Sequence, residues 1–152
     1  MRHPDEVALL VEKIRASANH VPELELVAED DSGVTGFVMV SWAPLEGAAR
    51  DRILNFSPLA VHPGRQGQGI GAALTREAMR RVEELGEPAL MLEGIPAYYP
   101  RFGFERASAL GYVPPSATVP DEAFMVKRFA GWTPEDAGRI VYPEAFAHLS
   151  PA

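Results

Sequence analysis

The chain has 152 residues, a formal net charge of −7 and no cysteine, and 47% of its residues are hydrophobic. These values predict one domain, residues 1–152, with enough apolar surface to bury a core. They exclude disulfides, thiolate metal sites and cysteine nucleophiles. An acidic chain without a basic stripe argues against a nucleic-acid partner, and no apolar run approaches the ~20 residues that span a membrane. We therefore expect a cytoplasmic protein that binds neither nucleic acid nor membrane, and no metal, because His3, His20 and His148 lack ligand-like spacing.

The first half of the chain is expected to form a helix at residues 4–18 and strands at 24–28, 34–42 and 52–61, with a loop of small residues at 44–49. Apolar residues at helical spacing predict the helix, and short apolar runs bounded by polar turns predict the strands. The third strand contains Pro58, and a proline inside a strand is typical of an edge or a bulge. Such a bulge is either a plain irregularity or a place where unpaired backbone groups bind a ligand.

A glycine-rich turn follows the third strand. Its glycines alternate at positions 67, 69 and 71, and apolar periodicity predicts a helix over 70–85. Free N–H groups and the helix dipole make such a turn a phosphate site, although a turn without a ligand is the alternative. The P-loop pattern fails because Ala72 stands where Lys is required, and the dinucleotide pattern Gly-x-Gly-x-x-Gly is absent. The spacing that fits is Gln/Arg-x-x-Gly-x-Gly/Ala, filled by Gln66, Gly69 and Gly71.

This spacing closely resembles the pyrophosphate loop of the GNAT acetyltransferase superfamily. The resemblance implies that the pantetheine arm of acetyl-CoA (coenzyme A) lies beside the strand before the loop, at Leu59, Ala60 and Val61. It also implies that the loop and the first helical turn bind the pyrophosphate, through Arg65, Gln66, Gly67, Gln68, Gly69, Ile70, Gly71 and Ala72. Arg65 would neutralise the pyrophosphate, or it is a solvated turn residue.

A second motif follows the helix. An apolar run at 89–92 predicts a buried parallel strand, so residues 59–92 form a strand–helix–strand unit. Behind it stands Tyr98-Tyr99-Pro100-Arg101-Phe102-Gly103-Phe104. A tyrosine four residues before a Gly-Phe pair resembles the second signature of the superfamily, in which a short helix ends at that glycine. The whole run resembles a bacterial subgroup of predicted N-acetyltransferases. The resemblance implies that Tyr99 is the general acid, with a core aromatic as the alternative. Arg101 would reach the nucleotide end of the cofactor or pair with a carboxylate.

The remainder is expected to form strands at 109–113 and 123–129, a proline-rich loop at 114–120 and an extended segment at 138–146. The fold class that follows is α/β, a mixed α+β sheet with a strand–helix–strand core. By resemblance it is a GNAT-like acyl-CoA N-acyltransferase fold with splayed central strands. That family normally opens with a strand and a helix ahead of the helix expected at 4–18. We therefore expect either that the first strand is absent or that the assigned start codon lies too far downstream. The absence of this strand would affect the acceptor site more than the cofactor site, because the strand forms one wall of the acceptor site.

Acetyl transfer from a thioester to an amine requires a neutral amine, a polarised carbonyl and a proton for the departing thiolate. Backbone N–H groups around Leu59–Val61 would polarise the carbonyl, and Tyr99 would supply the proton. Glu93, at the end of the strand at 89–92, is the candidate general base, with His62 or solvent as alternatives. The predicted activity is direct transfer of an acetyl or short acyl group to a primary amine, carried by a small molecule or a protein.

Two rival functions remain open. A non-catalytic module that binds or senses acyl-CoA would keep the loop but lack an acceptor site. An unrelated nucleotide-binding domain would prefer ATP or NAD to coenzyme A. The resemblance also suggests a homodimer, which would cover the sheet edge left bare by the absent first strand.

Overall fold

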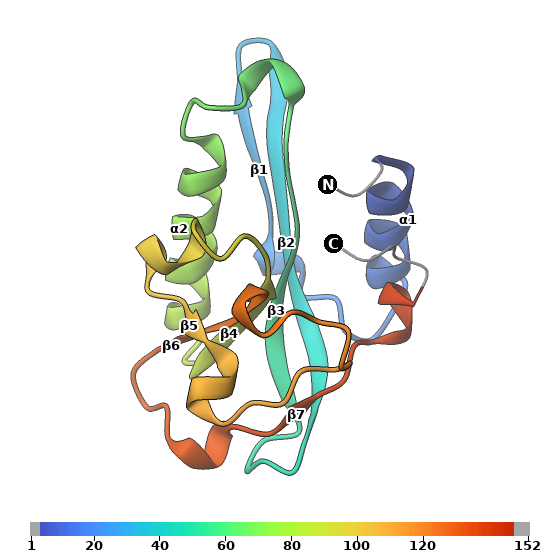
Figure 1. Ribbon diagram of the computed structural model, residues 1–152. Coiled ribbons are helices and arrows are strands. Elements are labelled where there is room, and N and C mark those ends of the chain that lie inside the picture. The colour runs from blue at the N-terminus through green and yellow to red at the C-terminus, as the bar shows by residue number, and fades with distance from the viewer. Residues whose placement is uncertain (1–3, 148–152) are drawn as a thin grey trace.

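The computed structural model describes residues 4–147, in which a mixed β-sheet separates two α-helices on its opposite faces (Figure 1). In chain order the elements are α1 (Pro4–Arg15), β1 (Glu25–Asp30), β2 (Gly33–Glu46), β3 (Arg52–Val61), α2 (Ile70–Glu84), β4 (Ala89–Glu93), β5 (Glu105–Arg106), β6 (Phe124–Arg128) and β7 (Arg139–Ile140). The seven strands follow the order β1-β2-β3-β4-β6-β5, and β7 pairs with β2. The predicted mixed α/β class is confirmed, while His3 and His148 lie outside the described residues.

The predicted strand–helix–strand unit is formed by β3, α2 and β4. Strands β1, β2 and β3 are antiparallel neighbours, and α2 then carries the chain across to β4, which runs parallel to β3. Helix α2 buries Leu74, Ala78 and Val82, which recur at helical spacing. Gly36 of β2 permits close approach of this helix, because a Cβ there would stand 2.8 Å from Cγ2 of Ile70.

Apolar side chains are buried on both faces of the sheet. Beneath α2, the cluster combines side chains of the strands and the helix, among them Leu26, Val38, Val40, Leu54, Phe56, Leu74, Ala78, Val82, Leu90, Leu92 and Phe102. On the other face, α1 packs against Met39 of β2 through Leu10, Val11 and Ile14. The central strands therefore have no solvent face, which explains why β4 is a continuous apolar run.

The helix predicted at 4–18 ends earlier, at Arg15. The Ser17 hydroxyl donates to the Ile14 carbonyl (2.8 Å) and accepts the Asn19 N–H (3.1 Å). These side-chain bonds compete with helical backbone bonding and end the helix.

The loop predicted at 44–49 is shorter than expected, because β2 continues through its first three residues. Leu45 of β2 pairs with Ile140 of β7, and Glu46 pairs with Arg139. The segment predicted as extended at 138–146 thus contributes a short strand, followed by the 3₁₀ helix η7 (Glu144–Phe146).

The strand predicted at 109–113 is wrong. Residues Ala107–Leu110 form the 3₁₀ helix η4, which closes at Gly111 with φ +96°. The glycine reverses the chain in a left-handed conformation that few other residues adopt, and only Val113 makes a β-bridge, with Arg139. The strand predicted at 123–129 is confirmed as β6, whereas β5, only two residues long, was not predicted.

Strand β1 forms one edge of the sheet. Helix α1 begins at the first described residue, so the expectation about a strand ahead of it falls outside the described residues. No helix in this part of the chain has the length and apolar character needed to cross a membrane.

Candidate active site

The central strands β3 and β4 part soon after they meet. They pair at only two positions, the second joining Asn55 to Met91. Beyond that point β3 runs on to Val61 beside β2, and β4 runs on to Glu93 beside β6. The facing edges of the two strands are therefore unpaired across an opening, and the predicted splay is confirmed.

The bulge predicted at Pro58 lies at the start of this opening. Val40 pairs with Phe56 and Val38 with Leu59, so Met39 alone faces Ser57 and Pro58. Past the bulge, the side chains of Leu59 and Val61 turn toward the first turn of α2, within 3.8 and 3.7 Å of where a Cβ on Gly71 would stand. Ala60, which alternates with them, is exposed.

The N-terminus of α2 lies directly behind β3 and leaves its backbone donors free. Gly69 caps the helix with φ +84° and no side-chain bond, and Gly67 has φ +80°. No described atom lies within 4 Å of a Cβ built at either glycine. Ala73 is the first helical residue whose N–H reaches a carbonyl, that of Gly69 (3.0 Å). The N–H groups of the three residues before it are thus available to an anion.

The loop before α2 is braced by its own side chains. Nδ1 of His62 accepts the Gly64 N–H (3.1 Å), so His62 caps the turn, and Gln66 donates its side-chain amide to the Val61 carbonyl (3.3 Å). Arg65 pairs with Asp30 (2.5 Å) in the turn between β1 and β2. Hydrogen bonds from Ser32 and the Arg65 charge lower the pKa of Asp30. Arg65 thus connects the loop before α2 to the turn between β1 and β2. Contacts of Arg65 and of the exposed Gln68 with a pyrophosphate stay predictions.

The ring of Tyr99 lies in the opening between the strands. It begins the 3₁₀ helix η3 (Tyr99–Phe102), which ends at Gly103 as predicted. Its centroid lies 6.2 Å from that of Phe56 on β3. On the other side it covers Gly94, directly after β4, where a Cβ would stand 2.5 Å from Cε2 of the tyrosine.

The Tyr99 hydroxyl makes no hydrogen bond with any described residue. Burial, with a smaller contribution from Tyr98, raises its pKa to about 12. A tyrosine that served only to fill the core would usually satisfy its hydroxyl. The geometry therefore offers a protonated donor inside the opening, and the general-acid role stays a prediction.

Glu93 lies at the same opening but on the other face of the sheet. Its neighbour Leu92 is buried on the α2 side, so alternation along β4 directs Glu93 away from α2. The hydroxyl of Tyr142 donates to Oε1 of Glu93 (2.8 Å), and the Tyr142 ring stacks on Phe146. Sequence reasoning missed Tyr142, because its only signal was its place in an extended segment 49 residues downstream.

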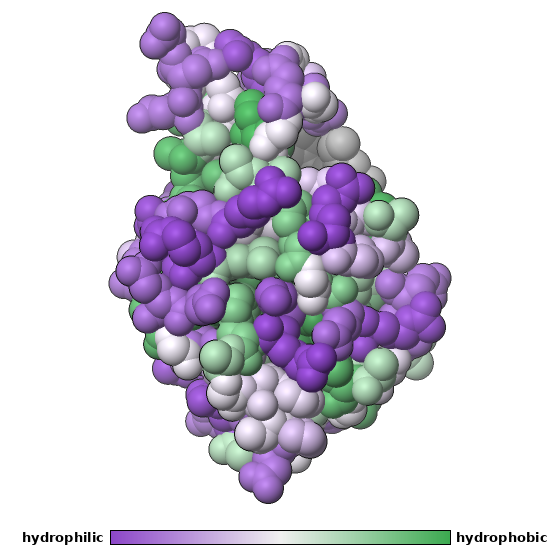
Figure 2. Space-filling view, turned by 90° about the vertical axis from the view of Figure 1, so that its left-hand side faces the viewer, coloured by the Kyte–Doolittle hydropathy of each residue, from purple (hydrophilic) through white to green (hydrophobic). Residues whose placement is uncertain are grey.

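Arg101 lies on the exposed side of η3. Its Nε donates to the Tyr98 carbonyl (2.8 Å), and its guanidinium stands 4.4 Å from the centre of the Tyr98 ring. No carboxylate among the described residues pairs with it, so of the two predicted roles the ion pair is not formed. Figure 2, which views the molecule from the α2 side, shows hydrophobic surface between hydrophilic patches.

Two buried polar side chains face each other where the strands part. Ser41 of β2 pairs in register with Asn55 of β3, and they are 0% and 2% exposed. Neither Oγ of Ser41 nor Nδ2 of Asn55 has a hydrogen-bond partner. Sequence reasoning had treated Asn55 only as a break in the strand.

The residues present fit an acyl-CoA. The free helix N-terminus offers donors that suit a pyrophosphate, and the unpaired edge of β3 offers backbone groups that suit an extended amide-bearing arm. Among the described residues, no group of acidic or histidine side chains could hold a metal ion.

Comparison with known proteins identifies the family. The profile of the acetyltransferase (GNAT) domain family matches residues 22–106, which include β1, the loop, α2 and Tyr99. The chain is 30% identical over 122 residues to the uncharacterized N-acetyltransferase YjhQ of Escherichia coli K12, across 80% of this chain and 65% of that protein. It is 40% identical over 86 residues to the uncharacterized N-acetyltransferase YhbS of the same strain, across 56% of this chain and 51% of that protein. The matches thus span between half and two thirds of these relatives.

Solved structures agree. The crystal structure of E. coli YhbS in complex with CoA superposes with a TM-score of 0.83 at 32% identity, covering 95% of this chain and 79% of that one. A GNAT family acetyltransferase from Brucella melitensis in complex with acetyl-CoA superposes with a TM-score of 0.73 at 28% identity, covering 95% and 80%. Since the family profile covers more than half of the sequence, the chain belongs to the GNAT acetyltransferase family.

Proposed function

We propose that the protein is an N-acetyltransferase that moves an acetyl or short acyl group from acetyl-CoA directly to a primary amine. The observation that carries this proposal is the unpaired Tyr99 hydroxyl in the opening between β3 and β4, beside a free helix N-terminus. Transfer from a CoA thioester requires an anion site, an oriented carbonyl and a proton donor. Relatives crystallised with CoA and with acetyl-CoA support the proposal.

Acetyl-CoA would supply the acetyl group as a thioester, and this chain would bind and orient it. The N–H groups of Ile70, Gly71 and Ala72 would face the pyrophosphate, whose charge the helix dipole favours. The unpaired edge of β3 around Leu59–Val61 would hydrogen-bond the pantetheine arm and hold the carbonyl in position.

Tyr99 would donate its proton to the departing sulfur. With a pKa of about 12, the hydroxyl stays protonated at neutral pH and is a competent donor. So weak an acid releases its proton only to a base of similar strength. The apolar surroundings that raise the pKa of Tyr99 would also raise the pKa of a thiol held beside it. The pKa difference between the two groups would therefore be smaller than the pKa of Tyr99 alone suggests.

Glu93 would accept the proton of the amine on the opposite face of the sheet. Tyr142 holds Oε1 of Glu93, so the carboxylate presents its remaining lone pairs in a fixed orientation. Acid and base would then act from the two sides of one opening, with the reacting carbonyl between them. No covalent enzyme intermediate is needed, which suits a chain without cysteine.

Calorimetric titration with acetyl-CoA, with ATP and NAD as controls, tests the binding half of the proposal. Binding of acetyl-CoA alone is expected. A preference for ATP or NAD would contradict the proposal and favour an unrelated nucleotide-binding domain.

Thiol release from acetyl-CoA in the presence of a panel of amines tests the catalytic half. Release above the rate of hydrolysis with at least one amine is expected. Binding without release, across small amines and lysine peptides alike, would favour the sensing module instead.

The acceptor would be an amine of a small molecule or a protein, and the enzyme would act as a homodimer that covers the exposed edge of β1. Sedimentation would then give twice the chain mass of 16.5 kDa. A monomeric mass across the working concentration range would contradict the dimer without touching the proposed activity.

A further inference from the structure

Most cationic side chains of this acidic protein are paired with carboxylates. Within residues 4–147, the arginines that form such ion pairs are Arg15, Arg50, Arg65, Arg80, Arg81, Arg106, Arg128 and Arg139. The cations of this part that form none are Lys13, Arg52, Arg76, Arg101 and Lys127. Because the chain has 21 acidic and only 14 basic residues, carboxylates are in excess, and a cation without a carboxylate partner is therefore notable.

Three of these unpaired cations surround η3. The guanidinium of Arg76, on α2, stands 5.2 Å from the centre of the Phe102 ring, and that of Arg101 stands 4.4 Å from the Tyr98 ring. The two rings are themselves 5.4 Å apart. Lys127 reaches the end of η3, since a Cβ on Gly103 would stand 3.0 Å from its Nζ. Lys127 in turn lies 5.5 Å from the centre of the Phe129 ring. Apart from Nε of Arg101, which donates to the Tyr98 carbonyl, the N–H groups of these cations make no hydrogen bond within the described residues and can bind an anion.

The segments around this cluster contain no acidic residue. Residues 62–76, 94–104 and 124–129 form the loop with the start of α2, the η3 segment and β6 with its following residue, and none includes Asp or Glu. The acidic residues that flank these segments on α2 and β5, Glu77 and Glu105, are paired with other arginines, so they do not neutralise the three cations. This patch adjoins the free N-terminus of α2, because Arg76 follows Ile70 by six residues, or about 9 Å of helix.

We infer that Arg76, Arg101 and Lys127 form a subsite for the 3′-phosphate of the coenzyme A nucleotide, and that the protein discriminates against cofactors lacking it. This inference rests on the proposed function, since it names the part of acyl-CoA that this surface binds. A phosphate monoester carries more than one negative charge at neutral pH, and guanidinium groups bind it through parallel hydrogen bonds. Nε of Arg101 is already bonded to the Tyr98 carbonyl, so its other nitrogens are held in place for a ligand.

Calorimetry with CoA and with 3′-dephospho-CoA tests the subsite, because the two ligands differ only in that phosphate. The wild type is expected to bind CoA about tenfold or more tightly. Arg76→Gln and Arg101→Gln are each expected to weaken CoA binding several-fold and to leave dephospho-CoA binding unchanged. In the double variant the two ligands should bind almost equally.

Arg52→Gln is the matched control. Arg52 is also unpaired and rests on an aromatic ring, 3.7 Å from that of Trp42, but it lies at the other end of β3. The Arg52→Gln variant should bind CoA and dephospho-CoA as tightly as the wild type does. Arg76 is exposed and makes no hydrogen bond within the described residues, so its replacement should not disturb folding.

The possible outcomes separate the two proposals. If the wild type binds CoA and dephospho-CoA equally, the subsite is overturned while CoA binding stands. If Arg76→Gln weakens both ligands to the same degree, the arginine acts on the shared pyrophosphate and the inference is equally wrong. If the wild type binds neither, the proposed function itself fails.

Discussion

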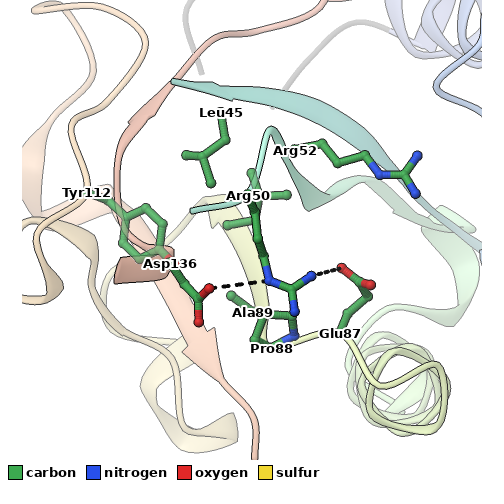
Figure 3. Close-up of a pocket in the computed structure, with 9 residues that line it drawn as sticks. Leu45, Arg50, Arg52, Glu87, Pro88, Ala89, Tyr112 and Asp136 are labelled. Atoms are coloured by element: carbon green, nitrogen blue, oxygen red, sulfur yellow. Dashed lines mark hydrogen bonds and ion pairs between the residues drawn. The ribbon is translucent and has the colours of Figure 1, made fainter. Parts of the chain in front are cut away.

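The two ends of the β3–β4 pair differ in whether their polar groups have hydrogen-bond or ion-pair partners. At the end where β3 begins, Arg50 points between Asp136 (3.3 Å) and Glu87 (3.8 Å) beside a small pocket (Figure 3). The Asp136 carboxylate also accepts the Thr133 N–H (2.9 Å). Three loops that are distant in sequence are joined there by groups that satisfy one another.

At the other end, where the strands part, polar groups are left without partners. The Tyr99 hydroxyl, the Asn55 amide nitrogen and the Ser41 hydroxyl are unbonded, and so are the first N–H groups of α2. Of these, the Ser41 and Asn55 atoms are buried, and a buried polar group without a partner has a free-energy cost of about 1–3 kcal/mol. The contrast teaches that paired polar groups join the closed end, while the open end has donors available to the proposed cofactor. Variants at the two ends should therefore separate stability from activity.

Tyr99→Phe should have the largest effect at the open end. Loss of a general acid lowers kcat by about a hundredfold or more, while the unfolding free energy should change by no more than about 0.5 kcal/mol, since the hydroxyl makes no bond. Steady-state thiol release and urea unfolding measure the two quantities. An unchanged kcat would remove Tyr99 from the chemistry, whatever the effect on folding.

Asp136→Ala should show the reverse at the closed end. It leaves the Thr133 N–H without its acceptor and leaves Arg50 with Glu87 as its remaining carboxylate, which should lower the unfolding free energy by about 2 kcal/mol. Asp136→Asn is the matched control, because it keeps the oxygen that accepts from Thr133 and should lose less. In both, kcat per folded molecule should match the wild type; a specific loss of kcat would break the separation of the two ends.

Gly67→Ala and Gly86→Ala form a matched pair with a smaller effect. Both glycines have a similar positive φ, +80° and +78°, and neither has an atom within 4 Å of a built Cβ. Each substitution should therefore lower the unfolding free energy by about 1–2 kcal/mol. Only Gly67→Ala should also weaken acetyl-CoA binding in calorimetry, because only that glycine lies in the phosphate loop. Equal binding by both variants would argue against the loop as the cofactor site.

The smallest expected effect is an alkaline loss of stability. An unfolded tyrosine ionises near pH 10, whereas the folded pKa of Tyr99 is about 12. The folded state therefore retains the proton more strongly, and this contribution is complete below pH 10 and is lost as pH rises through 12. For a partly exposed group it should amount to about 1 kcal/mol. Urea unfolding of wild type and Tyr99→Phe at pH 9 and 11 should show a steeper loss for the wild type; parallel losses would contradict the raised pKa.

Sequence reasoning reached the parts of the site that depend on neighbours along the chain. The glycine spacing and the helical period from Ile70 specify the phosphate loop and α2 locally, and Gly103 specifies where η3 ends. The contact of Tyr142 with Glu93 could not be predicted in this way, because only the tertiary fold brings together residues 49 positions apart. The wrong strand at 109–113 has a related cause, since its apolar residues pack through a turn that Gly111 permits.

The pairing of β7 with β2 has a consequence for the nascent chain. Leu45 meets Ile140 only after a loop of about 95 residues has closed, and such contacts form late because the closure entropy must be met first. The phosphate loop and Tyr99 lie within a stretch that is complete by residue 106. During synthesis on the ribosome these residues emerge first, but the core beneath α2 still lacks Met125, and β4 lacks its partner β6. A chain released after residue 128 and before residue 142 would contain both sides of the opening without the Tyr142 contact to Glu93.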